Sequence, residues 1–168
     1  EKAPVDANGW PTTDAGTVVM SDLPVPPGQY RFICTGKCTL GVLSRGATTR
    51  GAGYDHASNT SVGIIDVAPG ATSLFINFKN THGGVRNIQL YRPGYRPRPG
   101  HPAPLFTHEF LDALKPFSTL RLMDFTRTNQ NDSVNWSDRP KLTDALQTGK
   151  RGVAWEYGIA FANTAHKD

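Results

Sequence analysis

The sequence lacks the features that define several classes of protein. Its apolar runs all fall short of the roughly 18 residues needed to cross a bilayer. It contains no Gly-x-Ser-x-Gly, no Gly-x-Gly-x-x-Gly and no phosphate loop, and its five histidines are scattered through turns, linker and tail. We therefore expect no membrane span, and no motif indicates a nucleotide site or a serine nucleophile.

The charge is low and dispersed. The formal net charge is +4, and the densest basic group is Arg92, Arg96 and Arg98. These arginines alternate with proline and glycine, a pattern typical of an extended linker rather than of a nucleic-acid surface, so no nucleic-acid partner is expected. The chain opens on Glu1 where a primary translation product would carry methionine, as a processed chain would.

Cysteine is scarce, and both cysteines lie in one short segment, Cys34-Thr-Gly-Lys-Cys38. Alternating flanks predict a hairpin that would bring the two cysteines to about the 5.5 Å Cα separation of a disulfide. The alternative is two free thiols. Zinc is not expected, because no second Cys or Cys/His pair has ligand spacing. A Cys34–Cys38 disulfide would indicate an exported protein.

Glycine and proline are plentiful, with 17 and 13 residues, and only 38% of the chain is hydrophobic. This composition favours a β-rich fold with many turns over a helical bundle. Six short alternating segments predict strands, and no helical pattern separates them. They are Gly16–Ser21, Gln29–Thr35, Cys38–Ser44, Thr60–Val67, Thr72–Asn80 and Val85–Arg92. An antiparallel β-sandwich, of the jelly-roll kind, is expected over residues 1–97.

The connection from Ser44 to Thr60 is too long and glycine-rich for a tight turn. It contains Tyr54, Asp55 and His56, and it is interpreted as either a ligand-facing loop or a mobile one. One histidine and one aspartate do not make a metal site, so no metal ligands are assigned.

The pattern changes after a proline-rich linker at residues 98–104. Residues 105–168 predict a helix over His108–Leu114 capped by Thr107, a buried strand over Thr119–Phe125, a long polar loop and a helix over Gly152–Ala165. A short helix over Leu142–Thr148 is a further candidate. The expected fold class is therefore mainly β with an α/β tail: a sandwich followed by a helix-strand-helix segment.

Most of the chain, and best the part after Val85, resembles the N-terminal region of large secreted bacterial proteins. In that family a carbohydrate-binding-like β-sandwich precedes a glycoside-hydrolase-like (β/α)8 barrel, of which only the first β-α unit would be present here. The resemblance rests on Val85–Ile88, Arg92–Tyr95, Phe106, Phe110, Leu111, Leu120–Phe125, Thr128, Asn129, Asn135–Arg139, Glu156, Tyr157, Ala162 and Asn163. It implies secretion, and calcium is the one ion such a sandwich often holds; no other cofactor is expected.

The polar loop after Phe125 contains the candidate binding residues. Sugar rings stack their C–H faces on indole, and their hydroxyls need planar amide and guanidinium partners. The candidates are Asp124, Arg127, Asn129, Asn135, Trp136 and Arg139, with Tyr54 on the sandwich. The alternatives are a Trp136 that packs the loop onto the core and an Asp124 that pairs with a neighbouring arginine.

These patterns predict a secreted, carbohydrate-associated protein that binds a polysaccharide or glycan. A glycoside hydrolase needs two positioned carboxyl groups, and no such pair is recognisable, so catalytic residues are not assigned. One alternative is an interaction module that assembles through the Thr119–Phe125 strand. Another is a piece of a hydrolase, with a second fragment or copy of the chain completing the α/β part.

Overall fold

The structure, a computed structural model, describes residues 3–96 and 103–167. The chain divides into two compact units, Glu1–Ala103 and Pro104–Asp168, which are described separately. The expected linker at 98–104 lies almost wholly outside the described residues. No helix among the described residues is long and apolar enough to cross a membrane.

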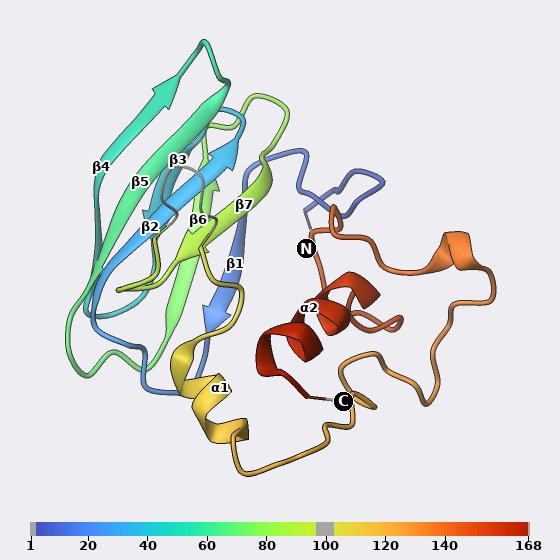
Figure 1. Cartoon of the computed structure of the whole chain (residues 1–168). Helices are drawn as coiled ribbons and strands as arrows, with labels where there is room; N and C mark the ends of the chain where they lie inside the picture. The colour runs from blue at the N-terminus through green and yellow to red at the C-terminus, as the bar shows by residue number, and fades with distance from the viewer. Residues whose placement is uncertain (1–2, 97–102, 168) are drawn as a thin grey trace. The chain divides into compact units, whose positions relative to one another are not determined.

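The first unit is built from two antiparallel sheets (Figure 1). Its strands are β1 (Ala15–Met20), β2 (Gly28–Thr35), β3 (Thr39–Val42), β4 (Ala47–Asp55), β5 (Thr60–Val67), β6 (Leu74–Lys79) and β7 (Arg86–Tyr91). One sheet has the order β1-β6-β3 and the other β4-β5-β2-β7. The mainly β, sandwich-like prediction is confirmed. The finer jelly-roll prediction is not, since a jelly roll has eight strands and the described residues form seven.

The core lies between the two sheets. Phe32 of β2 stacks on Phe78 of β6 with ring centroids 5.6 Å apart, which joins one sheet to the other. Alternate residues of β2 and β5 are buried, as a two-layer fold requires, and Ile65 and Leu74 are fully buried. Tyr30 is also buried, and its hydroxyl donates to the Pro26 carbonyl at 2.9 Å.

Strand β4 corrects the interpretation of the Ser44–Thr60 connection as a loop. Most of it is a nine-residue strand paired with β5, closed by a tight turn in which Asp55 accepts hydrogen bonds from Ala57 N and Ser58 Oγ. The pairing shifts register between Arg50 and Gly53, and Gly51 has φ +59°. Gly51 and Gly53, which made the strand hard to recognise in the sequence, accommodate this bulge.

The predicted hairpin around the cysteines is wrong. Strand β2 pairs with β5 and β7, whereas β3 pairs with β6, so the short connection between them crosses from one sheet to the other. Cys34 and Cys38 are free thiols whose sulfur atoms lie 3.7 Å apart, well beyond the roughly 2.05 Å of a disulfide bond. The absence of a Cys34–Cys38 disulfide therefore removes the argument that the protein is exported because it contains one.

The second unit has two α-helices, α1 (His108–Leu114) and α2 (Trp155–Ala165), among its described residues. The prediction of α1 is confirmed, including the cap: Thr107 Oγ1 accepts from Phe110 N at 3.2 Å. The predicted helix over Gly152–Ala165 forms in its later part, because Gly152 has φ +74° and lies outside α2. No helix forms over Leu142–Thr148, where the chain makes isolated turns.

The predicted strand Thr119–Phe125 does not form, so the helix-strand-helix description is wrong. Residues 123–127 are turn, and Thr126 N donates to the Leu122 carbonyl at 3.0 Å. The apolar side chains of this segment pack on α2 instead: Phe125 meets Phe161 with ring centroids 6.4 Å apart, and Leu122 approaches Gly158. A lone strand has no ladder to join, so burial against a helix replaces pairing.

Candidate functional site

The polar loop of the second unit is held in place by its own side chains. Asn131 Nδ2 donates to the Thr126 and Arg151 carbonyls, both at 3.0 Å, and thereby ties together two segments of the unit. Gln147 Oε1 accepts from Ala154 N at 2.9 Å, which gives α2 the N-terminal partner that Ala154 itself cannot supply. The loop is therefore a defined structure.

Asp138 is one of these structural groups. Its carboxylate accepts from Asn135 N at 2.9 Å and Asn135 Nδ2 at 3.2 Å, closing the 3-10 turn Trp136–Asp138. These hydrogen bonds, the backbone one first, hold the pKa of Asp138 below its usual value. The carboxylate stays ionised, and its hydrogen bonds position Trp136 rather than a reacting group.

The segment 122–131 separates two hollows in the second unit, and its residues divide between them. We call the first the tryptophan hollow. It has a volume of about 680 Å³ and is lined by Leu122, Thr126, Thr128, Asn131, Ser133, Val134, Asn135, Trp136, Arg139, Trp155, Gly158, Ile159 and Ala162. The second, the aspartate hollow, has a volume of about 600 Å³. It is lined by Met123, Asp124, Phe125, Arg127, Asn129, Gln130, Gln147, Thr148, Gly149, Gly152 and Val153.

Two exposed tryptophans meet at the tryptophan hollow. Trp136 is 68% exposed and Trp155 is 53% exposed, and their rings are nearly perpendicular, at 73°, with centroids 6.2 Å apart. The Arg139 guanidinium covers one face of Trp136, 4.2 Å from the ring centroid. The side chains of Val134 and Ile159 are also exposed and line the same hollow. An apolar corner of this kind offers flat surfaces to a ligand with an apolar face.

Polar atoms without a protein partner lie in the same part of the unit. Arg139 Nη2 reaches Glu156 Oε1 at 3.4 Å, a long ion pair. Arg139 Nε, Glu156 Oε2 and Ser133 Oγ are buried and have no partner among the described residues. Buried polar atoms are normally hydrogen-bonded, so these three are exceptions, and of their residues Ser133 and Arg139 line the tryptophan hollow.

The amino-acid residues predicted to bind sugar line different hollows. Asn135, Trp136 and Arg139 line the tryptophan hollow, whereas Asp124, Arg127 and Asn129 line the aspartate hollow. Asp124 is exposed and forms no ion pair with any described residue, so the expected alternative, a pair with a neighbouring arginine, is not present. The alternative for Trp136, a plug in the core, is excluded by its exposure.

Tyr54 belongs to a third hollow, on the first unit, which we call the sandwich-end hollow. It has a volume of about 420 Å³ and is lined by Thr35, Gly36, Lys37, Tyr54, His56, Asn59, His82, Gly83, Gly84 and Arg86. Tyr54 Oη donates to Asn59 Oδ1 at 2.9 Å, and its ring meets that of His56 edge-on at 4.6 Å. These contacts fix the tyrosine at the edge of the hollow.

The thiols of Cys34 and Cys38 shift each other's pKa in opposite directions. A hydrogen bond from the Cys34 thiol lowers the pKa of Cys38 to about 7, and the same contact, together with burial, raises the pKa of Cys34. Ser61 Oγ accepts from Cys38 N at 3.1 Å and donates to the Gly36 carbonyl at 2.8 Å. No group of three or more His, Cys, Asp or Glu side chains in the described ranges is placed to hold a metal ion.

No protein-family model, curated protein or solved structure matches the chain.

Trp155 is the main residue of the tryptophan hollow that the sequence did not indicate. Its place among the apolar residues of the last helix predicts burial, but Trp155 and Ile159 lie on the exposed side of α2, whereas Phe161 is buried. Lys37 and His82 were likewise missed at the sandwich end, because they come from separate connections and no local pattern joins them. A signal was available only for Trp155, as one of just three tryptophans in the chain.

Proposed function

We propose that this protein binds a polysaccharide or glycan, and that the tryptophan hollow is the binding site. The observation that carries the proposal is the pair of exposed, nearly perpendicular tryptophans, Trp136 and Trp155, at one hollow. Indole rings held open to solvent provide the flat apolar surface on which a sugar ring stacks. Because Arg139 already covers one face of Trp136, the sugar would use the remaining face and the ring of Trp155.

Polar groups around the hollow suit the hydroxyl groups of a sugar. Ser133, Asn135 and Arg139 line the same hollow, and they carry a hydroxyl, an amide and a guanidinium group. A hydroxyl group can donate and accept at once, so one sugar can serve both kinds of atom. The capping box of Asp138 and Asn135 holds this rim in shape before any ligand arrives, which reduces the entropy cost of binding.

Binding is proposed in place of hydrolysis. Two of the carboxylates in or beside the polar loop have unrelated settings, since Asp138 closes a backbone turn and Asp124 lines the other hollow. A glycosidase needs both of its carboxyl groups at one scissile bond. The alternative of assembly through the Thr119–Phe125 segment has no strand to act through among the described residues. Secretion stays a prediction that rests on the family resemblance.

The test is a glycan array with the full 168-residue chain, followed by titration of the best ligand. Trp136→Ala and Trp155→Ala should each weaken binding by about tenfold, as expected for the loss of one stacking surface. Phe117→Ala is the matched control, because Phe117 is 56% exposed in the same unit and lines neither hollow. Absence of binding to every polysaccharide, or wild-type affinity in both tryptophan variants, would overturn the proposal.

A further inference from the structure

Basic and hydrogen-bonding side chains gather at one end of the sandwich, around the sandwich-end hollow. They come from three separate connections: Lys37 lies between β2 and β3, His56 and Asn59 between β4 and β5, and His82 between β6 and β7. Arg86 adds a guanidinium at the start of β7. Sequence separation is large, so the fold alone assembles this group.

The hollow has no carboxylate among its described lining residues, and the nearest acids are already committed. Asp6 pairs with Arg86 at 3.0 Å. Asp55 does not line the hollow; it accepts hydrogen bonds from Ser58 Oγ and Ala57 N, and these bonds, that of Ser58 first, lower its pKa, so it stays a carboxylate in the turn. Lys37 is exposed and forms no ion pair with any described residue. Among the described lining residues, Lys37 is therefore the cation without an ion-pair partner.

Residues with hydrogen-bond donors line the same hollow as Lys37. Asn59 Oδ1 is engaged by the Tyr54 hydroxyl at 2.9 Å, which leaves the Asn59 amide NH2 as a donor. The imidazoles of His56 and His82 each have a ring N–H to offer. A hollow lined by a lysine and several hydrogen-bond donors suits an oxyanion, which accepts from several directions at once.

The backbone of the hollow is also pre-shaped. Gly36, Gly83 and Gly84 all have positive φ, and a Cβ on Gly84 would lie 1.8 Å from the Pro11 carbonyl oxygen. Gly36 packs against Gly84, where a Cβ would come within 2.8 Å of the Gly84 carbonyl oxygen. The β2–β3 and β6–β7 connections thus pack closely at glycines, and no side chain of these glycines fills this side of the hollow.

We propose that the sandwich-end hollow binds a carboxylate group of an acidic polysaccharide, with Lys37 supplying the charge and His56, His82 and Asn59 the hydrogen bonds. The inference rests on the proposed function for the saccharide nature of the ligand. It adds a second contact on the other unit and assigns the ligand class as anionic.

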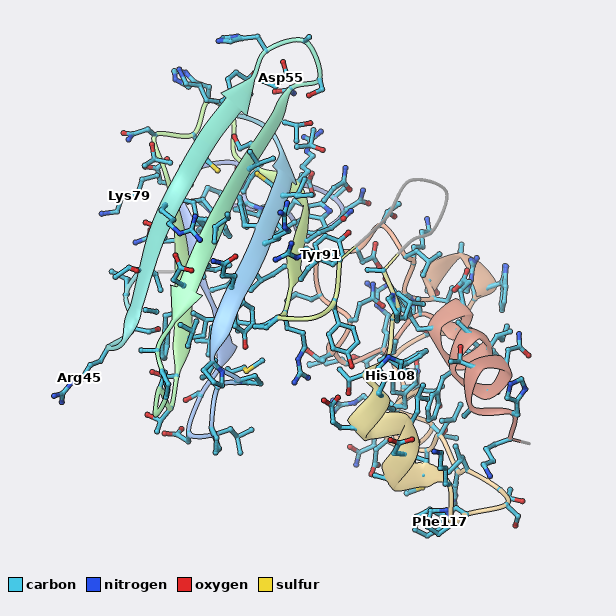
Figure 2. The ribbon with its side chains drawn as sticks, turned by 60° about the vertical axis from the view of Figure 1, so that its left-hand side comes forward. Arg45, Asp55, Lys79, Tyr91, His108 and Phe117 are labelled. Carbon is cyan, nitrogen blue, oxygen red and sulfur yellow. The ribbon has the colours of Figure 1, made fainter. Side chains whose placement is uncertain are left out.

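The test compares polygalacturonate with its fully methyl-esterified form, which has the same backbone but no charge. The full chain should bind the acidic form more tightly, and the preference should fall as salt is added. Lys37→Gln and His82→Gln should each reduce affinity for the acid by about threefold to tenfold and leave the ester unaffected. Arg45→Gln is the matched control. Arg45 lies just before β4, at the opposite end of the strand from Asp55, and the neighbours of Asp55 in the sequence, Tyr54 and His56, line the hollow (Figure 2).

Free anions are separated from sugar acids by two further titrations, with sodium sulfate and with galacturonate monomer. Chemical-shift changes at Lys37 and His82 with galacturonate or the polymer, absent with sulfate at the same ionic strength, support the saccharide site. Changes with sulfate alone would overturn it.

The two proposals fail in different ways. Equal affinity for acid and ester, lost in Trp136→Ala, would leave the proposed function standing and overturn the anion site. Binding of the acid that is lost in Lys37→Gln but unchanged in Trp136→Ala and Trp155→Ala would support the anion site and overturn the tryptophan hollow. If neither polymer nor monomer binds, the anion site is wrong.

Discussion

The guanidinium of Arg139 lies 4.2 Å from the centroid of the Trp136 ring and also reaches Glu156 Oε1 at 3.4 Å. One side chain thus links the indole of the polar loop to the first turn of α2. Trp136 is otherwise largely exposed, so this contact sets the orientation of the ring. A planar guanidinium makes both contacts at once, which a lysine ammonium cannot do as well.

Arg139→Ala should therefore loosen Trp136 and destabilise the second unit by about 1 kcal/mol, the usual value of a partly exposed cation–π contact. Guanidinium chloride unfolding followed by tryptophan fluorescence measures both effects, because Trp136 and Trp155 belong to this unit. Arg121→Ala is the control, since Arg121 is exposed and forms no ion pair with any described residue. Equal midpoints for the two variants would show that the contact does not stabilise the fold.

Cys38 should react with iodoacetamide along a pH profile whose midpoint lies near its lowered pKa of about 7. Cys34 should stay unmodified in the folded protein, because burial and the hydrogen bond to Cys38 raise its pKa. Cys34→Ala removes the donor that stabilises the Cys38 thiolate, so the midpoint should move to higher pH. Cys34→Ser keeps a donor and should shift the midpoint less; peptide mass spectrometry distinguishes the two sites.

Gly84→Ala should destabilise the sandwich by about 2 kcal/mol or more, because strain at positive φ and a steric clash act together. Gly84 has φ +83°, and a Cβ there would lie 1.8 Å from the Pro11 carbonyl oxygen. Gly83→Ala is a matched control, since Gly83 has φ +89° but nothing within 4 Å of a Cβ. Denaturant unfolding should show the smaller loss, about 1 kcal/mol, for Gly83→Ala. Similar losses in both would mean that the region rearranges around the clash.

Asp14 should make stability depend on pH in the acid range. It accepts hydrogen bonds from Thr81 N at 2.9 Å, Thr81 Oγ1 at 2.8 Å and Asn80 N at 3.0 Å, and these lower its pKa from the ordinary 3.8, with the Thr81 backbone bond as the largest cause. The folded state therefore favours the carboxylate. Its contribution is complete above the unfolded pKa and is lost as pH falls through the lowered folded value.

The thermal midpoints of the wild type and Asp14→Ala should differ at neutral pH and converge as the solution is taken below pH 3.8. Asp132→Ala provides the comparison, because the Asp132 carboxylate accepts no hydrogen bond from a described residue. If the difference in thermal midpoint between wild type and Asp14→Ala stays constant to the lowest pH, the charge of the Asp14 carboxylate does not contribute to stability.

The sandwich was predictable because its strands carry a local signal. In β6, Leu74, Ile76 and Phe78 alternate with more exposed residues, and period-two alternation of this kind indicates a half-buried strand without any knowledge of its partners. Pairing was less predictable. Strands β2 and β3 are separated by only three residues yet lie in different sheets, and a short connection with a plausible turn gives no sign of that.

The candidate site was predictable in composition but not in assembly. Asn135, Trp136 and Arg139 are close in sequence and line one hollow, whereas Trp155 joins them only because α2 packs on Leu122 and Phe125. The same packing explains the failed strand prediction, since a short apolar run between polar flanks suits a strand and a helix-covered turn equally well. Tertiary contacts decided between them.

The bulge between Arg50 and Gly53 affects whether two copies of this protein can pair through the edge of strand β4. Strand β4 is the outer strand of its sheet, so one row of its backbone donors and acceptors is unpaired within the unit. A flat outer strand is a template to which a second chain can add, and a bulge twists that template out of register. The bulge therefore makes the β4 edge of the sheet a poor template for pairing with a further copy.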